Sequence, residues 1–472
     1  MASKKIHAVL LPYPAFGHML PFYQLAIALA QSGIHVSYIS TPRNINRLPK
    51  PPQHLSPQIN FVSLPLPHVL DSDSNPVLPV GAESNMDIPM HQIQHLQKAF
   101  DLLQEPLKRF VLEHSPDWLI VDFIVPWATD VGRDCGVPVC AFSVFTAACN
   151  LFFGPPEYLT GEGQKRLRSS VESLTSPPEW VTFPSSVAYR RFEAIGTLMG
   201  FYGEDVTGMS VAKRIAKTIN ACQALALRTS REIEGEYLSL YTKLIGKPVI
   251  PVGLLPPEKP KERQITDESW TETFKWLDQQ EPKSIVFVGF GSESKPSQEE
   301  VYEVAYGLEE SGLPFLWSLR KPTWAKNDTD ALPPGFSQSD KKKVCIGWAP
   351  QMEILAHPAI GGTLFHVGWS SVIESLQFGH CLVALPLIVD QGLNARLLVE
   401  KGLAIEVERG EEDGSIRRKD VAKALKQAMG KEGEEMRARV RDVAPIFGDR
   451  EMNNGYIAGF VEYLKNEAGK RK

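Results

Sequence analysis

Short apolar runs alternate with longer amphipathic stretches through the first half of the chain. The runs fall at 6–11, 34–39, 59–64, 118–121, 137–145 and 224–227. Between them, apolar residues recur every three or four positions, as at 91–112 and 232–244, which predicts helices that bury one face. A further helix is predicted to begin at Pro21, after a turn-rich loop over 12–18. Strands that alternate with helices in this order predict a parallel, doubly wound α/β sheet.

The same alternation resumes after a proline-rich stretch at 248–262, which reads PVIPVGLLPPEKPKE and ends in clustered charges. Such a composition is typical of a linker between domains. The chain is also long enough for two α/β domains of ordinary size. We therefore expect a first domain at 1–249, a linker at 250–268, a second domain at 269–448 and a C-terminal helix at 449–472.

One stretch of the second half, Trp348–Gln391, predicts a strand–helix–strand unit. Its strands are the apolar runs at 360–365 and 381–389. Ser370 and Ser371 are expected to cap the helix between these runs. The polar residues that follow each strand would then share the carboxyl edge of a sheet, where open α/β sheets bind ligands.

The side chains at this edge each suit one part of a nucleotide-sugar. A helix N-terminus binds phosphate through its N–H groups, and Gly368 allows the backbone to approach closely. His366 can donate to the same anion, Trp348 can stack on a flat base and Glu374 can accept from a ribose diol. The residues that can bind sugar hydroxyls are Asp390 and Gln391. Together these side chains fit a nucleotide-sugar better than a plain nucleotide.

The 44 residues of Trp348–Gln391 resemble the signature box of plant family-1 UDP-glycosyltransferases, and the resemblance extends over essentially the whole chain. It implies the GT-B fold, in which two facing Rossmann-like doubly wound domains have a cleft between them. It further implies that the first domain binds the acceptor, that the second binds the UDP-sugar, and that the terminal helix returns to the first domain. The UDP-sugar is then a co-substrate, and no cofactor is expected.

The resemblance also implies roles within the box. Trp348 would stack on uracil, Gln351 would hold the nucleoside and Glu374 the ribose hydroxyls. His366 and the turn Trp369-Ser370-Ser371 would hold the diphosphate, and Asp390 and Gln391 would hold the donor sugar. Ala349 is a further expected donor contact. The family usually has cysteine, asparagine and proline at three positions that are here Val367, Ser370 and Cys381. Because serine is shorter than asparagine, the backbone of Ser370 is a better phosphate ligand than its side chain.

A histidine and an aspartate stand where predicted strands of the first domain end. His18 follows Gly17 in the loop after the first strand, and Asp122 follows the strand at 118–121. A transfer to a hydroxyl needs a base, and a carboxylate can orient a histidine for that role. By position alone, His18 could instead be an ordinary loop histidine and Asp122 a helix N-cap. The resemblance implies that they are the catalytic base and its partner.

Further contacts are predicted for both substrates. Ser292, after Gly291, is expected at a strand-to-helix junction that binds the diphosphate, and the resemblance places Thr146 near the donor sugar. Candidate acceptor-binding residues, of which half or more could be core, are Phe16, Met19, Phe123, Trp127, Phe145, Met199 and Phe201. No second carboxylate stands out as a nucleophile, so a single displacement that inverts the anomeric centre is predicted.

Composition disfavours several other classes of protein. A net charge of −5 argues against nucleic-acid binding, and no apolar run reaches the roughly 18 residues that span a membrane. His91 and His95 lie one helical turn apart but have only Gln-Ile-Gln between them, so no metal site is expected. The six cysteines form no Cys-x-x-Cys pair, which favours free thiols in a reducing compartment. We therefore expect a cytoplasmic monomer without a metal.

The identity of the substrates stays open. Stretches such as 40–45 and 390–396 resemble the branch of the family that elongates sugar chains on flavonoid, terpenoid and steroid glycosides. A glycoside acceptor is therefore expected, with Glu83, Asn85 and Asp87 as polar groups near His18, and an aglycone is the alternative. The donor sugar could be glucose, rhamnose or xylose. Rival functions are a sugar-nucleotide-binding protein without transfer activity and a nucleotide-sugar hydrolase.

Overall fold

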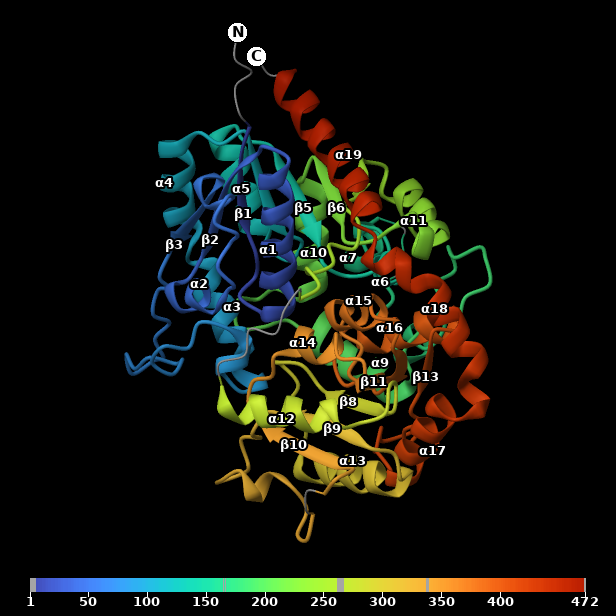
Figure 1. Ribbon diagram of the computed structural model, residues 1–472. Coiled ribbons are helices and arrows are strands. Elements are labelled where there is room, and N and C mark those ends of the chain that lie inside the picture. The colour runs from blue at the N-terminus through green and yellow to red at the C-terminus, as the bar shows by residue number, and fades with distance from the viewer. Residues whose placement is uncertain (1–5, 164, 166, 261–266, 337–338, 471–472) are drawn as a thin grey trace. The chain divides into compact units, whose positions relative to one another are not determined.

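The computed structural model describes residues 6–163, 165, 167–260, 267–336 and 339–470. The chain forms two compact units (Figure 1). Unit 1 comprises Met1–Ser173, Gly196–Leu255 and Arg450–Lys472, and unit 2 comprises Leu174–Ile195 and Pro256–Asp449. Part of the predicted linker at 250–268, residues 261–266, lies outside the described residues.

Unit 1 is built on a seven-stranded parallel sheet in the order β3-β2-β1-β4-β5-β6-β7. Its strands are β1 (His7–Leu11), β2 (His35–Ser40), β3 (Ile59–Ser63), β4 (Trp118–Asp122), β5 (Val139–Ser143), β6 (Ala224–Leu227) and β7 (Val249–Pro251). β4, β5 and β6 are buried along their whole length, which explains why they read as continuous apolar runs in the sequence. The predicted doubly wound α/β class is confirmed for this half.

The helices of the first half follow the predicted alternation, with one predicted helix divided in two and one that begins earlier than predicted. They are α1 (Phe16–Gln31), α2 (Pro42–Arg47), α3 (Ile93–Asp101), α4 (Gln104–His114), α5 (Pro126–Cys135), α6 (Ala147–Phe153), α7 (Pro156–Thr160), α8 (Val171–Leu174), α9 (Arg191–Thr197), α10 (Val211–Ala221) and α11 (Arg231–Ile245). The single helix predicted over 91–112 is divided into α3 and α4. The start predicted at Pro21 was wrong, because α1 begins at Phe16 and contains that proline. The Ala15 carbonyl already accepts from the N–H groups of His18 and Met19, at 2.9 and 2.8 Å.

The C-terminal helix α19 (Arg450–Gly469) belongs to unit 1. Its buried face holds four apolar residues at helical spacing, which are Ile457, Phe460, Val461 and Leu464. The Trp118 indole N–H donates to the carbonyl of Leu464 at 3.0 Å. Asn453 Oδ1 accepts from the backbone N–H groups of Leu254 and Leu255, at 2.7 and 3.3 Å. These bonds hold the helix to the segment that follows β7.

Unit 2 is built on a six-stranded parallel sheet in the order β10-β9-β8-β11-β12-β13. Its strands are β8 (Ile285–Gly289), β9 (Phe315–Leu319), β10 (Lys342–Ile346), β11 (Ile360–Phe365), β12 (Cys381–Ala384) and β13 (Ala404–Glu406). Its helices include α12 (Glu268–Asp278), α13 (Gln298–Ser311), α14 (Gln351–Leu355), α15 (Trp369–Leu376), α16 (Gln391–Glu400), α17 (Arg418–Met429) and α18 (Glu434–Gly448). This half is again a doubly wound α/β unit, as predicted.

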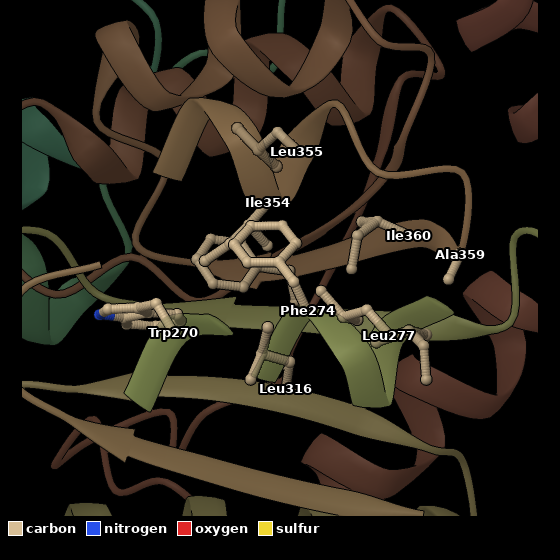
Figure 2. Packing of buried hydrophobic residues seen from close by; sticks show 10 residues of the cluster. Trp270, Phe274, Leu277, Leu316, Ile354, Leu355, Ala359 and Ile360 are labelled. Atoms are coloured by element: carbon tan, nitrogen blue, oxygen red, sulfur yellow. The ribbon is translucent and has the colours of Figure 1, made fainter. Parts of the chain in front are cut away.

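An apolar cluster joins α12 and α14 to the second sheet. Figure 2 shows Phe274 and Leu277 of α12 lying over Leu316 of β9, with Ile354 of α14 beside them. These side chains are almost fully buried, and burial of each stabilises the fold by about 1.5–3 kcal/mol. The cluster fixes α14, which begins three residues after Trp348, against the sheet.

One segment of the first half lies in the second unit. Residues 174–195 cluster with unit 2, whereas the sequence prediction placed all of 1–249 in one domain. The physical reason is a set of polar contacts with α16 and with the end of β13. They include the ion pair of Glu193 with Arg396 and a 3.0 Å contact of Arg190 with Glu406. Because these partners are more than 200 residues apart in sequence, no local pattern indicated them.

Asn453→Ala should lower the free energy of unfolding by about 1–3 kcal/mol, because two buried backbone N–H groups would lose their acceptor. Urea unfolding followed by tryptophan fluorescence measures the change. Asn454→Ala is the matched control, since Asn454 is the next residue of α19 and is exposed. Equal unfolding midpoints for the two variants would contradict the role given to Asn453.

Candidate active site

His18 and Asp122 meet at the carboxyl edge of the first sheet. His18 lies in the first turn of α1, and Asp122 is the last residue of β4, the strand that pairs with β1. His18 Nδ1 lies 2.8 Å from Asp122 Oδ2. The carboxylate is fully buried, whereas the imidazole is partly exposed. Asp122 was predicted to be the partner of His18, and the structure places the two side chains within hydrogen-bonding distance.

Backbone N–H groups also hold the Asp122 carboxylate. The Tyr13 N–H donates to Oδ2 at 3.1 Å, and the Ile124 N–H reaches Oδ1 at 3.4 Å. A buried carboxylate is costly unless such donors satisfy it. The bond to Nδ1 favours the imidazole tautomer with its proton on that nitrogen, which leaves Nε2 as the basic atom. The arrangement can therefore accept a proton at Nε2 and stabilise the resulting imidazolium.

Aromatic rings surround the His18 imidazole. Phe123 stacks with it at a centroid distance of 6.0 Å, and the rings of Tyr13 and Phe145 approach at 5.6 and 6.3 Å. Trp127 is linked to this group through Phe100, which contacts both Tyr13 and Trp127. Three of the predicted acceptor-binding residues thus belong to one aromatic group around the histidine.

The other predicted acceptor-binding residues lie in different surroundings. Met19 is fully buried and its sulfur lies 3.9 Å from Ser40 Oγ, as in a core residue. Phe16 is also buried. Phe201 stacks on Phe153 at 4.1 Å within a π-helical turn, Leu198–Tyr202, whereas Met199 in the same turn is mostly exposed.

Two predicted donor contacts have clear local roles in the structure. Thr146 is buried and caps α6, because its hydroxyl accepts from the Cys149 N–H at 3.0 Å. Ser292 lies in a turn after β8, and its carbonyl accepts from Arg320 at 2.7 Å. The expectation that Ser292 stands at the junction of a strand with the next helix was wrong, because α13 begins only at Gln298. The N-cap of α13 is Ser297, which forms a capping box with Glu300.

Three side chains predicted to bind the nucleoside lie just before α14, at its first residue and on α15. Trp348 is 63% exposed, and its carbonyl accepts from the Trp270 indole N–H at 3.2 Å. Gln351 Nε2 donates to Glu374 Oε2 at 2.6 Å. Ala349 is partly buried against the apolar cluster of Figure 2. The structure therefore brings Gln351 and Glu374 together, beside a tryptophan whose ring is open to solvent.

His366 packs between two glycines at the end of β11. A Cβ added to Gly291 or to Gly368 would lie 2.7 Å from the imidazole, so neither position accepts a larger residue without displacing the ring. Burial lowers the pKa of His366 to about 4, against the opposing effect of the Gly289 backbone. The imidazole is therefore neutral at pH 7 and carries a single N–H.

The helix after this histidine begins two to three residues earlier than the predicted caps, Ser370 and Ser371, required. The N-cap of α15 is Gly368, and Trp369, Ser370 and Ser371 form the first turn, so the expected side-chain caps were wrong. Trp369 is buried, and its ring lies 6.5 Å from that of Phe447. Its side chain is therefore part of the core, so Trp369 can serve an anion only through its backbone.

The loop before α16 is held by its own side chains. Gln391 Oε1 accepts from the N–H groups of Leu387 and Ile388, both at 2.9 Å. Asn394 Nδ2 donates to Asp390 Oδ2 at 2.7 Å and to the carbonyl of Val367 at 3.1 Å. This one amide thus joins the two loops to which diphosphate and sugar contacts were assigned.

Sequence reasoning missed several residues that position this site. Asn394 follows Asp390 by four residues on one helix, so its i,i+4 spacing was a usable signal. Tyr13 precedes His18 by five residues, but its backbone bond to Asp122 has no sequence signature. Tyr189, whose hydroxyl donates to the Val389 carbonyl at 3.0 Å, was not identifiable because the partners are 200 residues apart.

Metal ligands and membrane spans were also searched for. Within the described ranges, no three His, Cys, Asp or Glu side chains gather as a metal site. None of the helices that the structure describes is long and apolar enough to cross a membrane. All six cysteines are free.

Acidification should destabilise the fold between about pH 6.5 and 4, in part through His366. In this window the unfolded chain binds a proton at His366 that the folded chain does not, so stability falls as pH falls. His366→Gln should make the free energy of unfolding less dependent on pH in this window. The slope should fall by at most about 1.4 kcal/mol per pH unit, the value for a difference of one bound proton. Urea unfolding at stepped pH values measures this slope. His91→Gln is the control, because His91 is exposed. An unchanged slope in His366→Gln would contradict the assignment.

Comparisons with known proteins are consistent with this geometry. Residues 266–470 match the family model described as UDP-glucoronosyl and UDP-glucosyl transferase. The chain is 39% identical over 469 residues to soyasaponin III rhamnosyltransferase of Glycine max, covering 98% of this chain and 96% of that protein. It is 40% identical over 465 residues to UDP-glycosyltransferase 91C1 of Arabidopsis thaliana, covering 98% and 97%.

A solved structure has the same fold. Glycyrrhiza uralensis UGT73P12, complexed with glycyrrhetinic acid 3-O-monoglucuronide, aligns with a TM-score of 0.78 at 23% identity, over 99% of this chain and 97% of that one. The likeness identifies the fold as GT-B. With relatives this similar over nearly its whole length, the chain belongs to the plant family-1 UDP-glycosyltransferases and is a UDP-glycosyltransferase.

Proposed function

We propose that this enzyme transfers a sugar from a UDP-sugar to a plant specialised metabolite that already carries a sugar, with inversion at the anomeric carbon. The observation that carries the mechanism is the 2.8 Å contact between His18 Nδ1 and Asp122 Oδ2. It orients a basic Nε2 among aromatic rings that can bind an apolar acceptor. His18 is the general base, and Asp122 is its orienting partner.

The reaction is a single displacement. His18 Nε2 takes the proton of the acceptor hydroxyl as its oxygen attacks the anomeric carbon. The bond from that carbon to the UDP oxygen breaks on the opposite face, so the configuration inverts. Asp122 stabilises the imidazolium that forms, and UDP leaves with the bonding electron pair.

Unit 2 supplies the proposed donor contacts. Trp348 stacks on the uracil, while Gln351 and Glu374, already bonded to each other, bind the nucleoside. The neutral His366 and the backbone of the first turn of α15 bind the diphosphate, whose negative charge the positive end of the helix dipole favours. The donor sugar is assigned to Asp390 and Gln391. A metal ion is not part of the proposal.

The acceptor is proposed to be a glycoside on two grounds. The similar Glycine max protein is named a soyasaponin III rhamnosyltransferase, and the similar structure of UGT73P12 contains a monoglucuronide. In this chain, the Tyr13 hydroxyl donates to Asn85 Oδ1 at 3.2 Å, which brings a polar pair next to the His18 ring. A sugar needs such polar groups beside an apolar bed.

Two other polar residues predicted for the acceptor have structural roles instead. Asp87 forms a bidentate ion pair with Arg47, at 2.5 and 2.9 Å, and its carboxylate caps the turn that begins at Ser84. Glu83 accepts from the backbone N–H of Arg43 at 2.7 Å. These bonds fix the loop that presents Asn85, so Asp87 and Glu83 act on an acceptor only through that residue.

The cell compartment and the oligomeric state are also proposed. Six free cysteines suit a reducing compartment, so the enzyme is assigned to the cytoplasm. The enzyme is also proposed to act as a monomer.

His18→Ala should lower turnover by about 10²–10⁴-fold, the usual contribution of a general base, while UDP binding stays unchanged. Trp348→Ala should show the reverse pattern, with UDP binding weakened. Product mass spectrometry measures transfer, and calorimetry with UDP measures binding. His91→Ala controls for the loss of an exposed histidine.

Three outcomes would contradict the proposal in different ways. Near wild-type turnover in His18→Ala would contradict the assignment of His18 as the general base. Unchanged UDP affinity in Trp348→Ala would place the nucleotide elsewhere. UDP release at the same rate with and without any acceptor would indicate a hydrolase, and UDP-sugar binding without turnover would indicate a binding protein.

A flavonoid or terpenoid monoglycoside should be a better acceptor than its own aglycone, because a site that binds sugar hydroxyls leaves polar groups unpaired with the aglycone. Comparison of kcat/KM for matched pairs measures the preference, across UDP-glucose, UDP-rhamnose and UDP-xylose. Asn85→Ala should reduce the preference more than it reduces turnover of the aglycone. Equal kcat/KM for aglycone and glycoside would return the enzyme to the class that acts on aglycones.

A further inference from the structure

We propose that residues 174–195, here called the strap, position the donor-sugar loop and decide which UDP-sugar the enzyme accepts. The inference rests on the proposed function, because it assigns the sugar contacts to Asp390 and Gln391. The strap comes from the first half of the chain, yet it belongs to unit 2. Figure 1 shows its α9 in green among the orange elements of that unit.

The first contact is at the donor-sugar loop itself. The Tyr189 hydroxyl donates to the carbonyl of Val389 at 3.0 Å, and Tyr189 is almost fully buried. Val389 directly precedes Asp390 and has a φ of 52°, in the left-handed region. A β-branched residue pays a steric penalty there and stays only where neighbours hold it. The hydrogen bond from Tyr189 stabilises Val389 in this conformation, and it sets the direction in which the chain enters α16.

The second contact is at the first turn of α16. The carboxylate of Glu193 lies 2.7–2.8 Å from the position that a Cβ on Gly392 would occupy. Gly392 follows Gln391 directly, so a negative charge lies against the N-terminal turn, where the helix dipole favours it. The Glu193 side chain is nine-tenths buried, and within the described residues its Oε1 has no hydrogen-bond partner. A buried carboxylate oxygen this close to the proposed sugar contacts limits the shape and polarity of the sugar that fits there.

The third set of contacts anchors the strap. Arg396 of α16 pairs with both Glu193 and Glu406, and its Nε donates to the Ala188 carbonyl at 3.2 Å. Arg190 closes the group through Glu406 at 3.0 Å. Two arginines thus balance two glutamates in a largely buried cluster. Removal of Arg396 would leave the buried Glu193 carboxylate without its ion-pair partner, so this cluster holds the strap in place against α16.

One further contact serves as a matched control. Ser186 of the strap donates its N–H and its hydroxyl to Glu400 Oε2, at 2.6 and 3.2 Å. Glu400 is the last residue of α16, at the opposite end from the donor-sugar loop. Ser186→Ala removes the hydroxyl bond and keeps the N–H bond, so it weakens the strap without touching Val389 or Gly392.

The experiment compares Tyr189→Phe, Glu193→Gln and Ser186→Ala in the full chain, using UDP, UDP-glucose and UDP-xylose as probes. Tyr189→Phe should raise the KM for UDP-glucose about fivefold, with the Kd for UDP within twofold of wild type. Glu193→Gln should change the ratio of kcat/KM for UDP-glucose over UDP-xylose at least fivefold. Ser186→Ala should leave both KM and the ratio unchanged.

Unfolding midpoints separate a specific effect from a general loss of stability. Tyr189→Phe keeps the ring, and Glu193→Gln keeps the side-chain shape, so both variants should fold. Wild-type KM and wild-type sugar ratio in both would overturn the inference. A parallel rise in the Kd for UDP, or an equal effect of Ser186→Ala, would also overturn it, because the strap would then act on the whole unit.

Failure of the proposed function would look different. In that case Trp348→Ala would leave UDP binding intact, or the wild-type chain would show no sugar transfer. Neither result depends on the strap.

Discussion

The parallel orientation of every strand in both sheets is the constraint on which the candidate site depends. Because parallel strands end at the same edge, residues that follow neighbouring strands meet even when they are far apart in sequence. β1 pairs with β4, and so His18 and Asp122 lie together across 104 residues. β8, β11 and β12 are neighbours in the second sheet, and Gly291, His366 and the loop before Asp390 follow them.

Two valines show how much of this edge is held under strain. Val367 and Val389 have φ values of 56° and 52°. Val367 comes two residues after the end of β11, and Val389 lies in the loop between β12 and α16. Neither can relax freely, because Asn394 binds the carbonyl of the first and Tyr189 that of the second. Each bond contributes about 1 kcal/mol, which is comparable to the cost of a left-handed non-glycine residue. The strained backbone is therefore kept by tertiary contacts and not by local preference.

The sequence predicted the features that depend on local chemistry, and it failed where distant contacts decide. Buried parallel strands must be apolar on both faces, so runs such as 118–121 were readable as strands. The start of α1 was misplaced because Pro21 is an ordinary first-turn signal, yet the Ala15 carbonyl begins the helix earlier. The place of the strap could not be predicted, since the pairing of Glu193 with Arg396 spans 203 residues and leaves no periodic trace.

Glycines at this edge make room for side chains as well as for a ligand. Gly291 and Gly368 both lie against the His366 ring, and Gly392 lies against the Glu193 carboxylate. Gly291 has a φ of 71°, which glycine adopts at no steric cost, so this position is constrained by conformation and by space together. Gly291 and Gly368, which the sequence suggests as phosphate-binding glycines, are thus also required for the packing of the neutral His366 ring. The ring and the backbone are fixed together, and an anion that binds the turn meets donors whose positions are already set.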